Sequence, residues 1–270
     1  MNEYDDFQLP KIGIVGLGFV GGAIRNSING NNVVLVDNDP SRGTNTFEEL
    51  FECDGIFICV PSPQGDDGSC DTSILEEVLY KLTGYTGVII SKCTVPPEVY
   101  ERLNEQYPNL VHAPEFLTAA NANRDYTNGT FVFIGGRVSA YQHEAERIIR
   151  ITQHRLNKVI YCTIGEAALA KYTINSFLAT KVAFMNEIYF LSKSLGLDYN
   201  KISQMVACDE RIGRSHMKVP GPDGLFGFGG ACFPKDTSAL LKFAEEQSII
   251  MNVVDAAVKK NTLLRLTEPK

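Results

Sequence analysis

The sequence predicts an α/β protein, namely a Rossmann-type, doubly wound, mostly parallel sheet followed by an all-α domain with a long helix. Three observations predict this class. Short apolar strands alternate with helices from residue 11 to residue 162, which is the pattern of a parallel sheet covered on both faces. A glycine-rich turn joins the first strand to the first helix. Helical periodicity then replaces the alternation, and this change indicates a domain boundary near residue 163.

The elements of the first region follow from its apolar runs and helical spacing. We expect strands at residues 11–15, 32–37, 55–60, 87–91, 110–112, 131–134 and 158–162. We expect helices at residues 19–29, 47–51, 73–82, 97–106 and 140–152. Pro97 suits the first position of its helix, where the missing N–H costs nothing.

The second region contains one very long helix, or a nearly continuous pair, because residues 166–194 hold neither Pro nor Gly and apolar residues recur at helical spacing. Such a helix would form the spine of the second domain and favours a homodimer, although it could also pack only on its own chain. The expected organisation is a polar tail at 1–10, a dinucleotide-binding domain at 11–162 and a helical domain at 163–270 that carries the candidate catalytic cysteine.

Composition narrows the class of protein. The 270 residues are 44% hydrophobic and 21% charged, as in a globular protein with a substantial core. The net charge is −7 with mixed signs, which argues against a nucleic-acid partner. The N-terminus is polar and acidic, unlike a signal peptide, and no apolar run is long enough to cross a bilayer. We therefore expect a cytoplasmic enzyme without a membrane partner.

Cysteine and histidine usage excludes two further kinds of site. The seven cysteines are odd in number and form no CxxC pair, so reduced thiols are expected rather than a disulfide framework. The four histidines show no metal-binding spacing, so no metal site is expected.

The glycine-rich turn predicts a dinucleotide site. Gly16 would permit the tight turn, Gly18 would let the backbone approach the pyrophosphate, and Gly21 would let helix and strand pack closely. Asp37 ends the next strand, where its carboxylate would bind the ribose hydroxyls and repel a 2′-phosphate, so NAD is favoured over NADP. Arg42 would soften that preference. The alternative is a purely structural glycine turn.

Two loops that leave strands widen this candidate site. Residues 60–63 (VPSP) and 93–97 (CTVPP) turn sharply where open α/β sheets bind ligands, although ordinary exit loops would look similar. The predicted cofactor-binding residues are Gly16, Gly18, Phe19, Val20, Gly21, Asp37, Arg42, Pro61, Thr94 and Lys235.

The strongest chemical signal is the segment FGFGGACFPKD at residues 226–236. Its glycines indicate a backbone that lies close to another group. Cys232 stands beside Lys235 and Asp236, at the start of a helix expected from Asp236 onward, a setting that favours the thiolate and covalent catalysis on a carbonyl. The alternative for a single cysteine is a small buried apolar side chain.

Several motifs in order make the chain resemble the UDP-glucose/GDP-mannose dehydrogenase family over roughly residues 11–250. The matching pieces are GLGFVG with a following VD, VPSP, CTVPP, HAPEFL at 112–117, AKYTINSFLATK at 170–181, FMNE at 184–187, DERIG at 209–213, and FGFGGACFPKD.

The resemblance implies oxidation of a sugar C6 alcohol to a carboxylate with reduction of two NAD. Cys232 would attack the intermediate aldehyde, and the thiohemiacetal would be oxidised to a thioester that water hydrolyses. Lys171 and Asn175 would stabilise the oxyanion. Asp236, with Thr94 and a water, would take the first proton, and Glu115 would assist proton transfer or hydrolysis.

The resemblance also implies the substrate contacts, with UDP-glucose as the default nucleotide sugar. They are Glu115, Phe116, Leu117, Lys171, Asn175, Arg211, Phe226, Gly227, Phe228, Gly229 and Gly230. Arg211 would reach the sugar across a dimer. The alternatives are a solvated helix stripe for Lys171 and Asn175, an exposed loop acid for Glu115, and a surface ion pair for Arg211.

Three departures from the family pattern matter. Thr118 and Ala119 replace the usual Arg-Glu after the Pro-Glu-Phe-Leu stretch, so hydrolysis would depend more on Glu115 and water. Glu98 replaces the usual Gly after the proline pair. The sequence also ends at Lys270, before the domain that holds the nucleotide in typical members, so the usual nucleotide site is expected to be missing.

Other functions therefore stay open beside a shortened nucleotide-sugar dehydrogenase. One is NAD-dependent oxidation of a smaller alcohol or sugar. Another is a single-step 3-hydroxyacid or 6-phosphogluconate-like dehydrogenase, against which Cys232 argues. The last is a non-catalytic NAD-binding regulator or remnant.

Overall fold

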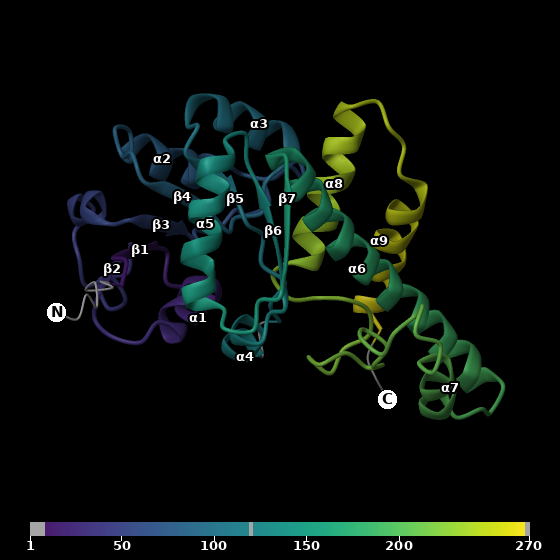
Figure 1. Cartoon of the computed structure of the whole chain (residues 1–270). Coiled ribbons are helices and arrows are strands. Elements are labelled where there is room, and N and C mark those ends of the chain that lie inside the picture. The colour runs from purple at the N-terminus through teal and green to yellow at the C-terminus, as the bar shows by residue number, and fades with distance from the viewer. Residues whose placement is uncertain (1–8, 119–120, 268–270) are drawn as a thin grey trace. The chain divides into compact units, whose positions relative to one another are not determined.

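Figure 1 shows the fold in a computed structural model, which describes residues 9–118 and 121–267. The chain divides into two compact units, Met1–Pro63 with Asp71–Lys171 and Gln64–Cys70 with Tyr172–Lys270. The predicted polar tail at 1–10 lies outside the described residues except for its last two.

The first unit is built on one sheet, which within the described residues has seven strands in the order β2-β1-β3-β4-β5-β6-β7. Its strands are β1 (Ile12–Val15), β2 (Val33–Val36), β3 (Gly55–Ile58), β4 (Val88–Ser91), β5 (Leu110–His112), β6 (Phe131–Gly135) and β7 (Lys158–Cys162). All neighbours pair in parallel except β5 and β6, which are antiparallel. The predicted α/β class with a mostly parallel sheet is confirmed.

Both faces of this sheet are buried, which explains why its strands read as continuous apolar runs. Side chains alternate between the faces along a strand. Ile12 and Ile14 join one large cluster with residues of the neighbouring strands and of three helices, whereas Ile56 and Ile58 on the next strand are fully buried outside that cluster. The loops at the strand ends are therefore held on a rigid frame.

Most helices of the first unit agree with the periodicity, which set no bounds for the helices at residues 199–206 and 252–265. They are α1 (Phe19–Ser27), the 3₁₀ helix η1 (Glu48–Glu52), α2 (Ser73–Lys81), α3 (Pro97–Gln106), α4 (Ala122–Thr127), α5 (Ser139–Thr152), α6 (Ile164–Ser194), α7 (Tyr199–Val206), α8 (Phe233–Glu246) and α9 (Asn252–Arg265). The short helix α4 was not predicted, because its six mostly polar residues are too few to show a helical period. None of the described helices is long and apolar enough to span a membrane.

Helix α6 is one continuous helix of 31 residues. A reciprocal capping box starts it, since Thr163 N–H donates to the Glu166 carboxylate (2.8 Å) and Glu166 N–H donates to the Thr163 hydroxyl (3.2 Å). Gly165 N–H donates to Glu101 of α3 at 3.0 Å. The first turns of α6 therefore belong to the first unit, and the division between the units falls after Lys171, inside the helix rather than at its start.

The second unit is helical apart from its loops. Aromatic and aliphatic residues of α6 pack with α7 and α9 around Phe226 and Phe228. The segment 64–70, although inserted in the first half of the sequence, docks on α8, where Gln64 donates to Ser238 and Ser238 donates to the Gly68 carbonyl, both at 3.0 Å.

Gly21→Ala should destabilise the protein by more than about 2 kcal/mol. A Cβ atom at this position would lie 1.9 Å from the Gly16 carbonyl oxygen, a backbone atom, so the main chain itself would have to shift. Urea unfolding followed by circular dichroism measures the change.

The neighbouring Gly22 provides the control, because a Cβ atom there would meet only the Leu17 carbonyl oxygen at 3.7 Å. Gly22→Ala should therefore raise stability by about 0.5–1 kcal/mol through helix propensity. Equal effects of the two substitutions would contradict the close approach at Gly21.

Candidate active site

The glycine turn has the geometry that its spacing predicts. Gly16 has a φ of +87°, and a Cβ on it would lie 2.8 Å from the Cys59 carbonyl oxygen. Gly18 precedes α1, and a Cβ on it would have no neighbour within 4 Å, so its backbone faces open space. The free N–H groups of the first turn of α1 suit an anion at this opening. These residues therefore fit a pyrophosphate.

Asp37 holds the same turn from the end of β2. Its carboxylate accepts hydrogen bonds from Leu17 N–H (2.6 Å) and Asp39 N–H (2.8 Å). Arg42 pairs with Asp39 at 3.3 Å, so a neighbouring carboxylate already matches its charge. A fixed negative charge beside the turn fits NAD better than NADP.

The remaining predicted cofactor residues of the first unit lie at the rim of the turn or in the exit loops. Phe19 and Pro61 are exposed, and Val20 packs partly against the core. The two exit loops are joined, because the Ser62 hydroxyl donates to the Thr94 carbonyl at 2.9 Å. Thr94 itself is buried.

Two side chains fix the loop that contains Thr94. The Tyr100 hydroxyl donates to the Cys93 carbonyl at 2.7 Å. His112 stacks on the Tyr100 ring at 4.2 Å, and its Nδ1 lies 3.1 Å from the Ser91 carbonyl. Burial lowers the pKa of His112 to about 3, so the ring is neutral and Nδ1 is the donor. The loop is therefore rigidly placed.

Lys92, in the same loop, is a functional candidate that the sequence analysis missed. Its side chain is buried, and its ammonium group lies over the rings of Phe57 (5.8 Å) and Tyr126 (6.0 Å). Burial lowers its pKa to about 8. A single lysine after an apolar strand gives no sequence signal, because lysines at strand ends usually extend into solvent.

Glu115 and Lys171 form a buried ion pair. Lys171 Nζ lies 3.3 Å from Glu115 Oε1 and also donates to the Glu115 carbonyl. The other carboxylate oxygen accepts Leu117 N–H at 2.5 Å. The Lys171 and Glu115 side chains are 4% and 10% exposed, so the alternatives of a solvated stripe for Lys171 and an exposed loop acid for Glu115 are wrong.

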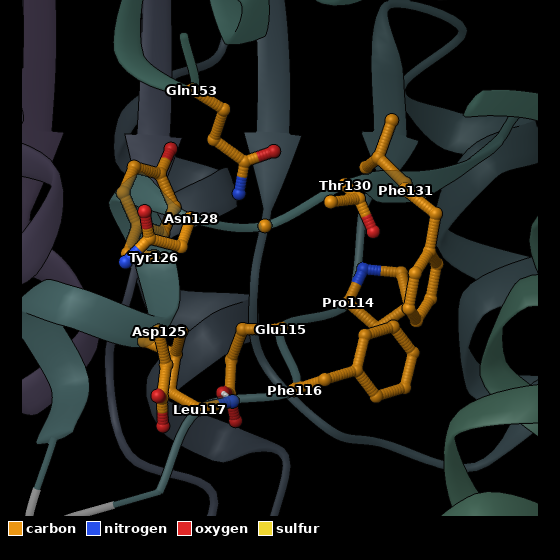
Figure 2. A pocket seen from close by; sticks show the side chains of 12 residues that line it. Pro114, Glu115, Phe116, Leu117, Asp125, Tyr126, Asn128, Thr130, Phe131 and Gln153 are labelled. Carbon is orange, nitrogen blue, oxygen red and sulfur yellow. Dashed lines mark hydrogen bonds between the residues drawn. The ribbon is translucent and has the colours of Figure 1, made fainter. Parts of the chain in front are cut away.

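A pocket of about 380 Å³ opens beside Glu115. Residues 114–117, 125–126 and 128–132 line it together with Gln153. Figure 2 shows Phe116 and Phe131 on one side of the pocket, while Glu115 lies at the end away from Gln153. The predicted substrate contacts Glu115, Phe116 and Leu117 therefore meet at one concave surface. Ala119, named as a departure from the family pattern, lies outside the described residues.

The second unit holds a separate buried carboxylate. Asp236 is 1% exposed, and its two oxygens accept hydrogen bonds from Asn175 Nδ2 and Lys235 Nζ, each at 2.5 Å. Asn175 is 6% exposed, so the alternative of a solvated stripe is wrong for it as well. Asn175 and Lys171 are four residues apart on α6, so they lie on one side of the helix.

Cys232 is the exposed residue that immediately precedes α8. Asp236 therefore lies one helical turn further along, and its N–H donates to the Cys232 carbonyl at 2.8 Å. The expected helix starts at Phe233 rather than at Asp236, because Pro234 occupies its first turn. This start brings the thiol nearer to the helix N-terminus than the sequence analysis placed it.

The other predicted substrate residues of the second unit differ in their surroundings. Phe226 and Phe228 are buried in the helical core. Arg211 pairs with Asp209 at 2.6 Å and its side chain is 89% exposed. The surroundings of Arg211 in this chain are therefore those of a surface ion pair, which was the alternative to a substrate contact. No group of three or more metal-binding side chains occurs among the described residues.

Comparisons with known families identify two domains in this chain. Residues 41–153 match the NAD binding domain of the UDP-glucose/GDP-mannose dehydrogenase family, and residues 165–263 match the central domain of the same family. The first unit therefore contains an NAD-binding domain.

Individual relatives carry one recurring name. UDP-glucose 6-dehydrogenase of Rickettsia bellii is 33% identical over 227 residues, which is 79% of this chain and 50% of the relative. The putative UDP-glucose 6-dehydrogenase YtcA of Bacillus subtilis is 35% identical over 74% of this chain and 48% of its own length. The chain thus spans about half the length of the curated relatives it matches.

A solved structure of a UDP-glucose dehydrogenase from Pyrobaculum islandicum has a similar fold. The two structures align with a TM-score of 0.82, and their sequences are 27% identical. The alignment covers 96% of this chain and 69% of the Pyrobaculum chain.

Lys92→Met should stabilise the protein by about 2 kcal/mol at neutral pH, because it removes a buried charge. The sign of the pH dependence follows from the lowered pKa. Between about 8 and the ordinary 10.5, the unfolded state holds a proton that the folded state has lost, so wild-type stability rises with pH in this window. Urea unfolding of wild type and variant across this pH window should show that the difference between their free energies of unfolding shrinks as the pH rises. A variant that is less stable than wild type at neutral pH, or a difference that stays constant with pH, would contradict this prediction.

Proposed function

Because the chain belongs to the UDP-glucose/GDP-mannose dehydrogenase family, we propose that it oxidises the primary alcohol of a nucleotide sugar, UDP-glucose by default, to a carboxylate with NAD. The observation that carries the proposal is the exposed Cys232 at the start of α8, one turn before the buried Asp236. An exposed thiol beside an otherwise buried polar cluster suits a nucleophile.

NAD supplies the hydride acceptor for both oxidations. In the first, the C6 alcohol loses a hydride and a proton to give an aldehyde, and Asp236 is the proposed proton acceptor. The Cys232 thiol then adds to the aldehyde carbon. The thiohemiacetal loses the second hydride and a proton to give a thioester, and water releases the carboxylic acid and the free thiol.

Lys171 and Asn175 are the proposed donors to the oxygen on the reacting carbon. An ammonium group has three N–H donors, and Glu115 takes two of those on Lys171. Among the described residues no acceptor takes the third N–H, which we assign to a ligand, and the ammonium group lies over the Phe116 ring, 5.0 Å from its centroid. Asn175 uses one amide N–H for Asp236 and has a second. Fixed donors in a buried setting stabilise a developing oxyanion strongly.

Glu115 is the proposed residue that orients the hydrolytic water, and Phe116 and Leu117 are proposed substrate contacts in the pocket beside it. The role proposed for Thr94 in the first proton transfer, and that of Arg211 across a dimer, rest on the family resemblance alone.

Cys232→Ala should reduce formation of the carboxylate from a nucleotide sugar, followed by mass spectrometry, to below about one-thousandth of the wild-type rate, while the first oxidation to the aldehyde can still yield NADH. The panel comprises UDP-glucose, GDP-mannose and UDP-N-acetyl sugars, with NADH followed by its absorbance. Cys208→Ser is the matched control, because Cys208 is the other exposed cysteine, and it should retain full activity.

Two outcomes of this experiment would overturn the proposal. One is that Cys232→Ala still forms the carboxylate; the other is that folded wild-type protein reduces no NAD with any nucleotide sugar. NADH production from free sugars or smaller alcohols alone would favour the second enzymatic function instead.

We also propose that the chain forms a homodimer through α6. Phe177, Phe184 and Leu191 are 68%, 56% and 54% exposed and recur every seven residues, so they form one apolar stripe along the helix. A second copy of the same stripe would bury it symmetrically.

Phe184→Asp should convert the dimer to a monomer, as measured by size-exclusion chromatography with light scattering, because a carboxylate would be buried against apolar side chains. Tyr80→Asp is the control, since Tyr80 is 75% exposed on α2 and does not belong to the stripe. A wild-type monomer, or an unchanged dimer in Phe184→Asp, would contradict the proposed interface.

A further inference from the structure

Helix α9 holds the glycine-rich segment that leads to Cys232. The Asn261 side chain makes two hydrogen bonds to one residue, accepting from Phe228 N–H (2.7 Å) and donating to the Phe228 carbonyl (3.0 Å). Arg265 Nε donates to the same carbonyl at 2.9 Å. Asn261 is buried, so water cannot take the place of either hydrogen bond, and losing one would leave a buried polar group unpaired.

Two of the glycines are required by these side chains. A Cβ on Gly227 would lie 2.3 Å from Asn261 Oδ1, and a Cβ on Gly229 would lie 1.6 Å from a guanidinium nitrogen of Arg265. At Gly230, by contrast, a Cβ would have no neighbour within 4 Å, although φ is +76°. The close approach that the glycines indicated is therefore an approach to α9, and Gly230 alone of these three faces open space.

Further bonds anchor both sides of this arrangement. Arg265 also pairs with Asp223 at 2.7 Å, which ties α9 to the loop before the segment. From α6, Asn186 accepts Gly227 N–H at 3.1 Å. Hydrogen bonds from both α6 and α9 thus hold the segment in place.

Aromatic packing connects the segment at residues 226–230 to Cys232. The Phe228 ring meets the Phe233 ring edge to face, with centroids 6.4 Å apart. Phe233 is the first residue of α8 and follows Cys232 directly. A shift of Phe228 would therefore displace the start of α8 together with Cys232.

We propose that Asn261 and Arg265 are positioning residues, which fix the backbone of residues 226–230 and thereby hold Cys232 at the start of α8 and present Gly230 to the ligand. This inference rests on the proposed function only for the identity of that ligand. The position of the thiol can be tested without any substrate.

Asn261→Asp tests the proposal with almost no change of shape. The carboxylate still accepts Phe228 N–H, but it faces the Phe228 carbonyl without a proton to donate. Alkylation of Cys232 by iodoacetamide, measured by peptide mass spectrometry relative to exposed Cys208 in the same sample, should fall about fivefold to tenfold, the effect of one or two lost hydrogen bonds.

Lowering the pH should reverse the effect, because a protonated carboxyl group again donates to the carbonyl; burial raises the pKa of such an acid, whereas the Arg265 guanidinium on the same carbonyl lowers it. The ratio of Cys232 to Cys208 alkylation, normalised to wild type, should therefore recover as the pH falls through the pKa of the introduced carboxyl group. A purely structural weakening of α9 would not recover in this way. Arg265→Lys, which keeps the charge but loses the planar fork, should show a smaller fall without pH recovery.

Lys259→Ala is the matched control on α9, because Lys259 pairs only with exposed Asp255 among the described residues and is itself 74% exposed. An alkylation ratio in folded Asn261→Asp that equals wild type, or the same fall in Lys259→Ala, would overturn the inference. If alkylation changes as expected while the wild type oxidises no nucleotide sugar, the proposed function fails and the positioning role stands.

Discussion

A buried carboxylate needs hydrogen-bond donors or a cation beside it, and this requirement organises the candidate site in both units. In the first unit Lys171 satisfies Glu115, and in the second Asn175 satisfies Asp236 together with Lys235. Both partners come from α6, one helical turn apart. Each carboxylate therefore depends on its own partner from α6, and the chemistry proposed for the chain depends on both pairs.

Glycines apply a second constraint, and their tasks differ. Gly16 and Gly21 are required because protein backbone occupies the space of a side chain, whereas the space at Gly18 is open. The same division recurs beside Cys232, where Gly229 meets Arg265 and Gly230 does not meet the protein. A glycine-rich motif thus combines residues that build the loop with residues that leave room for a ligand, and only the structure separates them.

Periodicity predicted the strands and most helices of the first unit because their apolar residues repeat within a few positions, and it predicted α6 as one very long helix or a nearly continuous pair. It set no bounds for α7 or α9. The short polar helix α4 gave no such repeat. Residues that act across long separations were also missed: Asn261 lies 33 residues from Phe228, and nothing local marks it as a partner. Lys92 was missed because its burial results from the packing of other strands and helices. Arg211 has a surface ion pair here, and a single chain cannot provide the partner surface that the family resemblance implies.

In the proposed reaction one thiol lets the chain carry out two successive oxidations on the same carbon. The ratio of NADH formed to nucleotide sugar consumed tests this most directly, with the sugar limiting and NAD in excess, and with the product identified by mass spectrometry. The account predicts a ratio of about two and a carboxylate product, since the thiohemiacetal is oxidised before release. A ratio of about one with free aldehyde as the product would contradict it, because Cys232 would then have no part in the reaction.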